Sequence, residues 1–206
     1  MQKLALRELI YVAFFAALTT VGAWISFPLP FSPVPITLAN LFAILSGVIL
    51  GKWLGSLSQI VYLLLGFAGV PVFAGHMAGP SVFRGPTGGY LVGYVLAAFV
   101  AGALIEHLPR FSRSASVESL YLTISLSLGA LIVYIPGVYW LARVTGMNLA
   151  TGMVKGFYPF LPGDIVKVFI GTLLCTSLIV QLPHIWKWPT GNRAARQAEA
   201  ENAKAG

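Results

Sequence analysis

Long apolar segments follow one another along this chain, and formal charges stand only between them. The charge-free runs comprise residues 9–51, 53–83, 85–105, 119–142 and 168–186. Each run reaches the roughly 18 to 20 residues that cross a bilayer as a helix. This pattern predicts an all-α integral membrane protein.

Proline and glycine divide these runs into spans and loops. We expect six transmembrane helices, over residues 4–25, 36–50, 53–67, 87–108, 119–144 and 164–182. Residues 27–35 contain four prolines, which exclude a membrane helix and predict a stiff, extended loop. Residues 69–85 form a second loop, and a short interfacial helix over 149–155 interrupts the third, 145–163. Pro136-Gly137 predicts a kink in the fifth helix. Residues 1–182 thus make one transmembrane domain, followed by a polar tail over 183–206.

Composition supports the membrane assignment, since 9% of the 206 residues are charged, against about a quarter in soluble domains. Six spans put both termini on one side. Nine of the thirteen basic residues share that side: Lys3, Arg7, Lys52, Arg110, Arg113, Lys187, Arg193, Arg196 and Lys204. Cytoplasmic loops carry the excess of Lys and Arg. We therefore expect a multi-pass protein of the bacterial cytoplasmic membrane with both termini cytoplasmic. The three loops, 27–35, 69–85 and 145–163, would then lie outside.

Asp164 and Lys167 open the last span, directly after Pro162-Gly163, which predicts a helix start. At a spacing of three they share one helix face. Ionisable groups at membrane depth are usually functional, so we expect this pair to offer an acceptor and a donor to a polar ligand. Two alternatives stay open: Asp164 as a helix N-cap, and Lys167 as a snorkelling lysine or a simple partner of Asp164.

Other polar positions flank the predicted loops. Arg84 suits a carboxylate, with lipid headgroups as the alternative, and Tyr90 is either pocket wall or membrane-interface aromatic. Thr37 and Asn40 lie one turn apart at the start of the second helix and are candidates to contact a ligand. Hydrogen bonding between helices is the alternative. Six aromatic residues are weaker candidates for an apolar wall: Phe27, Phe31, Phe73, Phe83, Tyr139 and Trp140.

Several classes of chemistry find no support in the pattern. Cys175 is the single cysteine, so no intrachain disulfide forms. His76 has no second ligand nearby, so no metal site is expected. We find no nucleophile–base pair, phosphate loop or ATP-binding motif, which argues against an enzyme and against a cofactor. The net charge of +7 reflects topology rather than nucleic-acid binding. Energy for transport must come from a gradient or another subunit.

Three motifs resemble the BioY family: Pro33-Val-Pro-Ile-Thr-Leu38, Gly85-Pro-Thr-Gly-Gly-Tyr-Leu91 and Pro159-Phe-Leu-Pro-Gly-Asp-Ile-Val-Lys167. These are biotin-binding S components of energy-coupling factor (ECF) transporters, and the resemblance covers residues 8–182. It implies a six-helix S-component bundle that holds biotin near the outer face, under the first loop. It also implies as partners a coupling transmembrane subunit and two ATPase subunits.

The resemblance assigns roles to particular residues. Asp164 and Lys167 match the polar binding pair. The remaining matches are Thr87, Gly88 and Tyr90 as pocket wall, Arg84 as partner of the biotin carboxylate, and Ala13 and Ala17 as the small face that meets the coupling subunit. One departure is Ala39, where the family pattern leads us to expect Gln, and Asn40 is a candidate substitute.

Two other functions remain open at this stage. A self-sufficient secondary transporter of biotin or a related vitamin would need no ATPase, although the chain shows no clear inverted repeat. A membrane-embedded enzyme is the weakest alternative, because no catalytic set is visible.

Overall fold

Six long helices make up most of the chain that the structure describes, as the apolar pattern predicts. The computed structural model describes residues 5–107 and 115–181, with side chains described over 5–106 and 119–177. The long helices are α1 (Leu6–Trp24), α2 (Ala39–Leu50), α3 (Lys52–Phe67), α5 (Gly88–His107), α6 (Ala115–Thr145) and α8 (Leu161–Gln181). The expected all-α bundle is confirmed. The polar tail, 183–206, lies outside the described residues.

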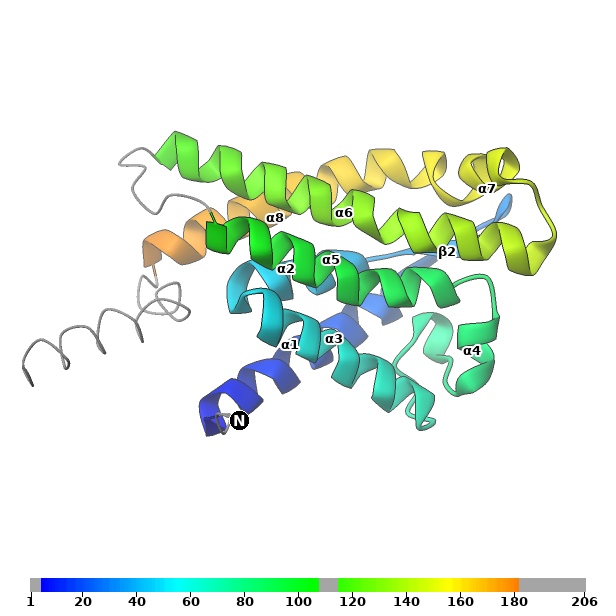
Figure 1. The fold of residues 1–206 in the computed structure, drawn as a ribbon, viewed down its shortest axis with the longest axis horizontal. Coiled ribbons are helices and arrows are strands. Elements are labelled where there is room, and N and C mark those ends of the chain that lie inside the picture. The colour runs from blue at the N-terminus through cyan, green and yellow to red at the C-terminus, as the bar shows by residue number, and fades with distance from the viewer. Residues whose placement is uncertain (1–4, 108–114, 182–206) are drawn as a thin grey trace, which may run out of the picture.

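Shorter elements gather at one end of the bundle. They are β1 (Ser26–Leu29), β2 (Ser32–Thr37), α4 (Pro80–Arg84), α7 (Leu149–Gly156) and two 3₁₀ turns, Ala74–His76 and Tyr158–Phe160. Figure 1 shows β2, α4 and α7 together at the right-hand end. The three loops singled out by proline and glycine therefore do converge in space.

The proline-rich loop is extended, as expected, but it is also regular. It forms an antiparallel hairpin, with Ser26 opposite Thr37 and Phe27 opposite Ile36. Proline tolerates a two-stranded ribbon, because each strand has a free edge where no N–H is required. The pairing also delays the second helix, which begins at Ala39 rather than at residue 36.

Four helical stretches of the described chain are long and apolar enough to cross a bilayer: Leu6–Trp24, Gly88–Glu106, Ser119–Thr145 and Leu149–Ser177. The other two expected spans are shorter, with 12 residues in α2 and 16 in α3. Nearly all of α2 is buried, and it packs against α1, α3, α5 and α6. Because protein rather than lipid surrounds α2, it has no need to match the bilayer thickness.

Glycine lets α2 approach its neighbours closely. A Cβ at Gly47 would overlap the backbone of Ala98 on α5, and one at Gly55 on α3 would overlap the backbone of Gly47. The turn between α2 and α3 is the single residue Gly51, whose φ of 84° suits glycine. These contacts make a dense core on the α1–α2–α3–α5 side.

The start of the last helix differs from the expectation. The last helix begins at Leu161, so Pro162 and Gly163 lie in its first turn rather than before it. Proline is favoured in that turn because its missing N–H needs no partner there. α6 runs continuously through Pro136, and the kink expected there stays a prediction.

Candidate functional site

Three side chains from two helices form a buried polar cluster beneath the loop end of the bundle. Lys167 Nζ lies 3.0 Å from Asp164 Oδ1 and 2.9 Å from Asn40 Oδ1. Asn40 Nδ2 donates to Asp164 Oδ1 at 3.1 Å, which closes the triangle. All three residues are buried, with Asp164 6% and Lys167 8% exposed. The cluster joins the start of α2 to the first turns of α8.

Tyr134, on α6, is the fourth member of the cluster. Its hydroxyl donates to Asp164 Oδ2, the carboxylate oxygen that Asn40 and Lys167 leave free. Nothing in the local sequence marks Tyr134, since aromatic residues are common in membrane helices. Sequence reasoning therefore missed it.

The geometry excludes two of the three alternatives for the charged pair and leaves open the third, Lys167 as a simple partner of Asp164. Asp164 is the fourth residue of α8, and its recorded partners are side chains of Asn40, Tyr134 and Lys167. The N-cap interpretation is therefore wrong. Lys167 does not snorkel, since its ammonium group is buried against Asp164. An ion pair at this depth persists because further hydrogen bonds satisfy the two charges.

A cavity lies against this cluster. Its walls come from α1, the β2 hairpin, α2, α3, the 69–87 loop, α5, α6 and α8: Ala23, Val34, Pro35, Thr37, Ala39, Asn40, Tyr62, Phe73, Ala74, Met77, Val82, Thr87, Tyr90, Leu91, Tyr94, Val133, Tyr134, Phe160 and Lys167. Lys167 is the one charged residue among these lining residues. Apart from the amide of Asn40, the rest of the lining is apolar or hydroxyl-bearing, which is typical of small-molecule sites.

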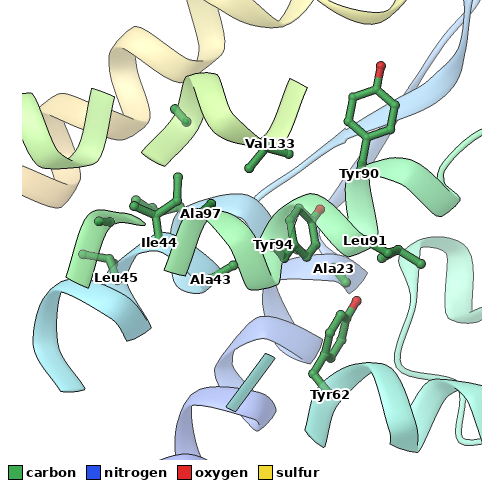
Figure 2. Close-up of a cluster of buried hydrophobic side chains, with 14 of the residues drawn as sticks. Ala23, Ala43, Ile44, Leu45, Tyr62, Tyr90, Leu91, Tyr94, Ala97 and Val133 are labelled. Carbon is green, nitrogen blue, oxygen red and sulfur yellow. The ribbon is translucent and has the colours of Figure 1, made fainter. Parts of the chain in front are cut away.

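Figure 2 shows part of this lining. Tyr62 from α3, Ala23 from α1, and Leu91 and Tyr94 from α5 lie around one region of the core, with Tyr90 nearer the start of α5. Tyr62 and Tyr94 are both buried, yet each brings a phenol group to the cavity. Neither tyrosine was among the residues that the sequence singled out.

Counting donors and acceptors shows what the cluster leaves for a ligand. Lys167 uses two of its three N–H groups, and Asn40 uses one of its two amide N–H groups. Both residues line the cavity. Asp164 Oδ1 accepts twice and Oδ2 accepts once. The cluster therefore keeps two spare donors on cavity-lining side chains and one spare acceptor site on Asp164.

The other predicted pocket residues have mixed outcomes. Thr87 and Tyr90 do line the cavity, and Tyr90 donates its hydroxyl to Gly156 O at 2.8 Å. Gly88 is absent from the lining and instead allows close packing, since a Cβ there would overlap the Phe83 carbonyl. Arg84 is exposed at the end of α4 and is also absent from the lining.

The remaining sequence candidates can now be placed. Of the six aromatic residues suggested as walls, Phe73 alone is in the cavity lining. Ala13 and Ala17 are both exposed on α1, free for contact with lipid or a partner helix. In the described part of the chain, no group of three or more His, Cys, Asp or Glu residues is placed to hold a metal ion.

Comparison with known proteins gives a consistent answer. The BioY family model matches residues 1–184. A probable biotin transporter BioY of Pyrococcus horikoshii is 42% identical over 172 residues, covering 84% of this chain and 96% of that protein. The biotin transporter BioY of Thermotoga maritima is 40% identical over 173 residues, with coverage of 84% and 96%.

A solved structure shares the fold. The S-component for biotin from an ECF-type ABC transporter superimposes with a TM-score of 0.76 at 29% sequence identity, covering 85% of this chain and 92% of that one. The family model spans most of the chain. Two relatives at 40% identity or more align with this chain over nearly their full length. This chain belongs to the BioY family.

Proposed function

We propose that this protein is the biotin-binding S component of an ECF transporter, a membrane subunit that captures biotin and passes it inward. The family is one of biotin transporters, and the superimposed structure is that of a biotin S-component. Both describe transport proteins rather than enzymes. The observation that carries the proposal is the polar cluster whose spare donors meet a mostly apolar cavity.

Biotin combines a small ureido group, an apolar thioether ring and an anionic tail. The ureido oxygen accepts two hydrogen bonds, which matches the spare donors on Lys167 and Asn40. The tyrosine- and valine-lined walls accommodate the thioether ring. Asp164 is absent from the cavity lining, but it accepts a hydrogen bond from each of the two donor residues and so orients them. Direct contact between Asp164 and a ureido N–H remains a prediction, supported by its one spare acceptor site.

The carboxylate of biotin has no free cation inside the cavity. Lys167 is already paired with Asp164 at 3.0 Å, and no second charged residue is among the lining residues. Burying an uncompensated carboxylate is costly. We therefore place the carboxylate at the opening, where Arg84 is exposed two residues beyond the cavity-lining Val82.

The test of this function is equilibrium binding by the purified protein in detergent or nanodiscs. Titration calorimetry with biotin should give saturable, one-to-one binding. A ring-opened analogue that keeps the valerate tail but lacks the ureido group should bind far more weakly. Equal binding of both compounds, or no biotin binding by folded protein, would refute the assignment.

The partners follow from the same family. An S component works with an ECF module, which we propose to contain a coupling transmembrane subunit and two ATPase subunits. The exposed small residues Ala13 and Ala17 lie one turn apart on α1, where a partner helix can approach closely. Replacing both with Leu should reduce co-purification with the module and leave biotin affinity within about twofold of wild type. Val92→Phe, at an exposed position on α5, is the matched control.

The alternative is a self-sufficient secondary transporter. Biotin uptake in cells lacking the ATPase subunits distinguishes the two functions, because a capture subunit alone should not accumulate biotin against a gradient. Accumulation at the wild-type level without any ATPase would favour the secondary transporter.

We also propose that both termini are cytoplasmic, which places β2, α4 and α7 on the outer side. A reporter fused after Gly206 should then report cytoplasm. Ser81→Cys should react with an impermeant maleimide in intact cells, with little background because the native Cys175 is buried. Labelling only after the membrane is opened would reverse the orientation.

A further inference from the structure

We propose that Tyr134 is a positioning residue for the ligand site, acting through Asp164. This inference rests on the proposed biotin-binding function. The Tyr134 hydroxyl holds one oxygen of the Asp164 carboxylate, while Asn40 and Lys167 hold the other. The carboxylate is thereby fixed in rotation, and with it the direction of the two donors that line the cavity.

The ring of Tyr134 is itself held in place by other aromatic rings. Its centroid lies 6.1 Å from that of Tyr90, 4.9 Å from that of Phe157 and 6.2 Å from that of Phe160. Contacts at 88° and 77° with the first two are edge-to-face, an arrangement that aromatic pairs prefer. A ring packed in this way has little freedom, so its hydroxyl direction is set before any ligand arrives.

The surroundings of Asp164 show why the hydrogen bond from Tyr134, called the tether below, is needed. A groove of about 610 Å³ runs between α6 and α8, and Asp164 and Tyr134 both line it. The carboxylate therefore borders open space on this side, although Asp164 as a whole is only 6% exposed. Asn40 and Lys167 both reach Oδ1, and Tyr134 is the recorded partner of Oδ2 among the described residues.

The tether also joins a third helix to the cluster. Asn40 belongs to α2, Asp164 and Lys167 to α8, and Tyr134 to α6. Without the hydroxyl, Asp164 Oδ2 would be a buried carboxylate oxygen with no partner, and the carboxylate would turn to find one. Its hydrogen bonds to Asn40 and Lys167 would then lose their geometry, and the cavity-lining donors would lose their alignment with the ligand.

Tyr134→Phe tests this role, because it keeps the packed ring and removes only the hydroxyl. We expect biotin to bind about tenfold more weakly, as for loss of a hydrogen bond to a charged group. Tyr139→Phe is the matched control: it removes a hydroxyl from the same helix, but Tyr139 is 55% exposed and its hydroxyl contacts Arg143. The affinity of the Tyr139→Phe variant for biotin should stay within twofold of wild type. In calorimetry the stoichiometry reports the active fraction, so partial unfolding does not obscure the affinity.

A double-mutant cycle separates positioning from packing. If Tyr134 acts through Asp164, adding Tyr134→Phe to Asp164→Asn should cost less than twofold further, because the carboxylate to be oriented is gone. The inference would be overturned if the loss of biotin affinity in the double variant equalled the product of the losses in the two single variants. Wild-type affinity of Tyr134→Phe would also overturn it. Both results leave the proposed function intact, provided that the wild-type protein binds biotin. Failure of the wild type to bind would refute the function itself.

Discussion

Two buried polar clusters lie inside this bundle, and only one of them has the character of a binding site. The first is the cluster of Asn40, Asp164, Lys167 and Tyr134. The second surrounds Gln59 on α3, whose amide nitrogen lies 3.2 Å from the hydroxyls of Thr19 and Ser46 and 3.0 Å from that of Ser58. Both link different helices through side-chain hydrogen bonds, and both are shielded from the surroundings.

The difference lies in charge and in what each cluster faces. In the Gln59 cluster the three hydroxyls donate to backbone carbonyls of their own helices, for example Thr19 to Phe15 O at 2.8 Å. No member of that cluster lines the cavity. The Asp164 cluster carries an ion pair and keeps spare donors on residues that do line it. Buried polarity alone thus indicates helix packing, whereas buried charge beside a cavity indicates recognition.

The largest effect is expected from Lys167→Met, which keeps the apolar stem and removes the ammonium. Losing a hydrogen bond between a charged group and its ligand costs about 1.5 to 3 kcal/mol, or roughly tenfold to over a hundredfold in affinity. Asp164 is also left without its cation, so the thermal midpoint should fall. Calorimetry and thermal denaturation check both effects. Near wild-type affinity would show that the ligand does not contact this cluster.

The opposite result is expected from Gln59→Leu. Hydrogen bonds between membrane helices contribute on average about 0.6 kcal/mol, and Gln59 Oε1 has no partner to lose. We expect a small decrease in thermal stability and biotin affinity within twofold of wild type. A tenfold loss of affinity in the folded variant would mean that the two clusters are coupled, and the comparison would fail.

A weak and salt-dependent effect on affinity is expected from Arg84→Gln. An exposed ion pair contributes about 1 kcal/mol at most, which corresponds to about fivefold in affinity, and salt screens it. We therefore expect a loss of up to fivefold at low ionic strength that disappears in high salt. Titrations at two salt concentrations check this. A salt-independent loss of a hundredfold would instead place Arg84 inside the site.

Several features were predictable from the sequence because they depend on local composition. Charge-free runs of bilayer length predicted the six helices, and prolines and glycines predicted the loops between them. Asp164 and Lys167 stood out because charges are rare in membrane-spanning segments. Their spacing alone placed them on one helix face. The small pair Ala13 and Ala17 came instead from the resemblance to the BioY family, and its role as a partner contact stays a prediction.

Contacts between helices could not be predicted from the sequence alone. Tyr134 precedes Asp164 by 30 residues, and the two meet only because α6 and α8 pack side by side. Tyr62 and Tyr94 face the cavity for the same reason, although nothing distinguishes them locally from other membrane aromatics. Tertiary packing also excluded Arg84 from the lining and replaced the N-cap role of Asp164 with side-chain partners. Helical period determines which residues share a face, whereas the packing of the helices decides what that face meets.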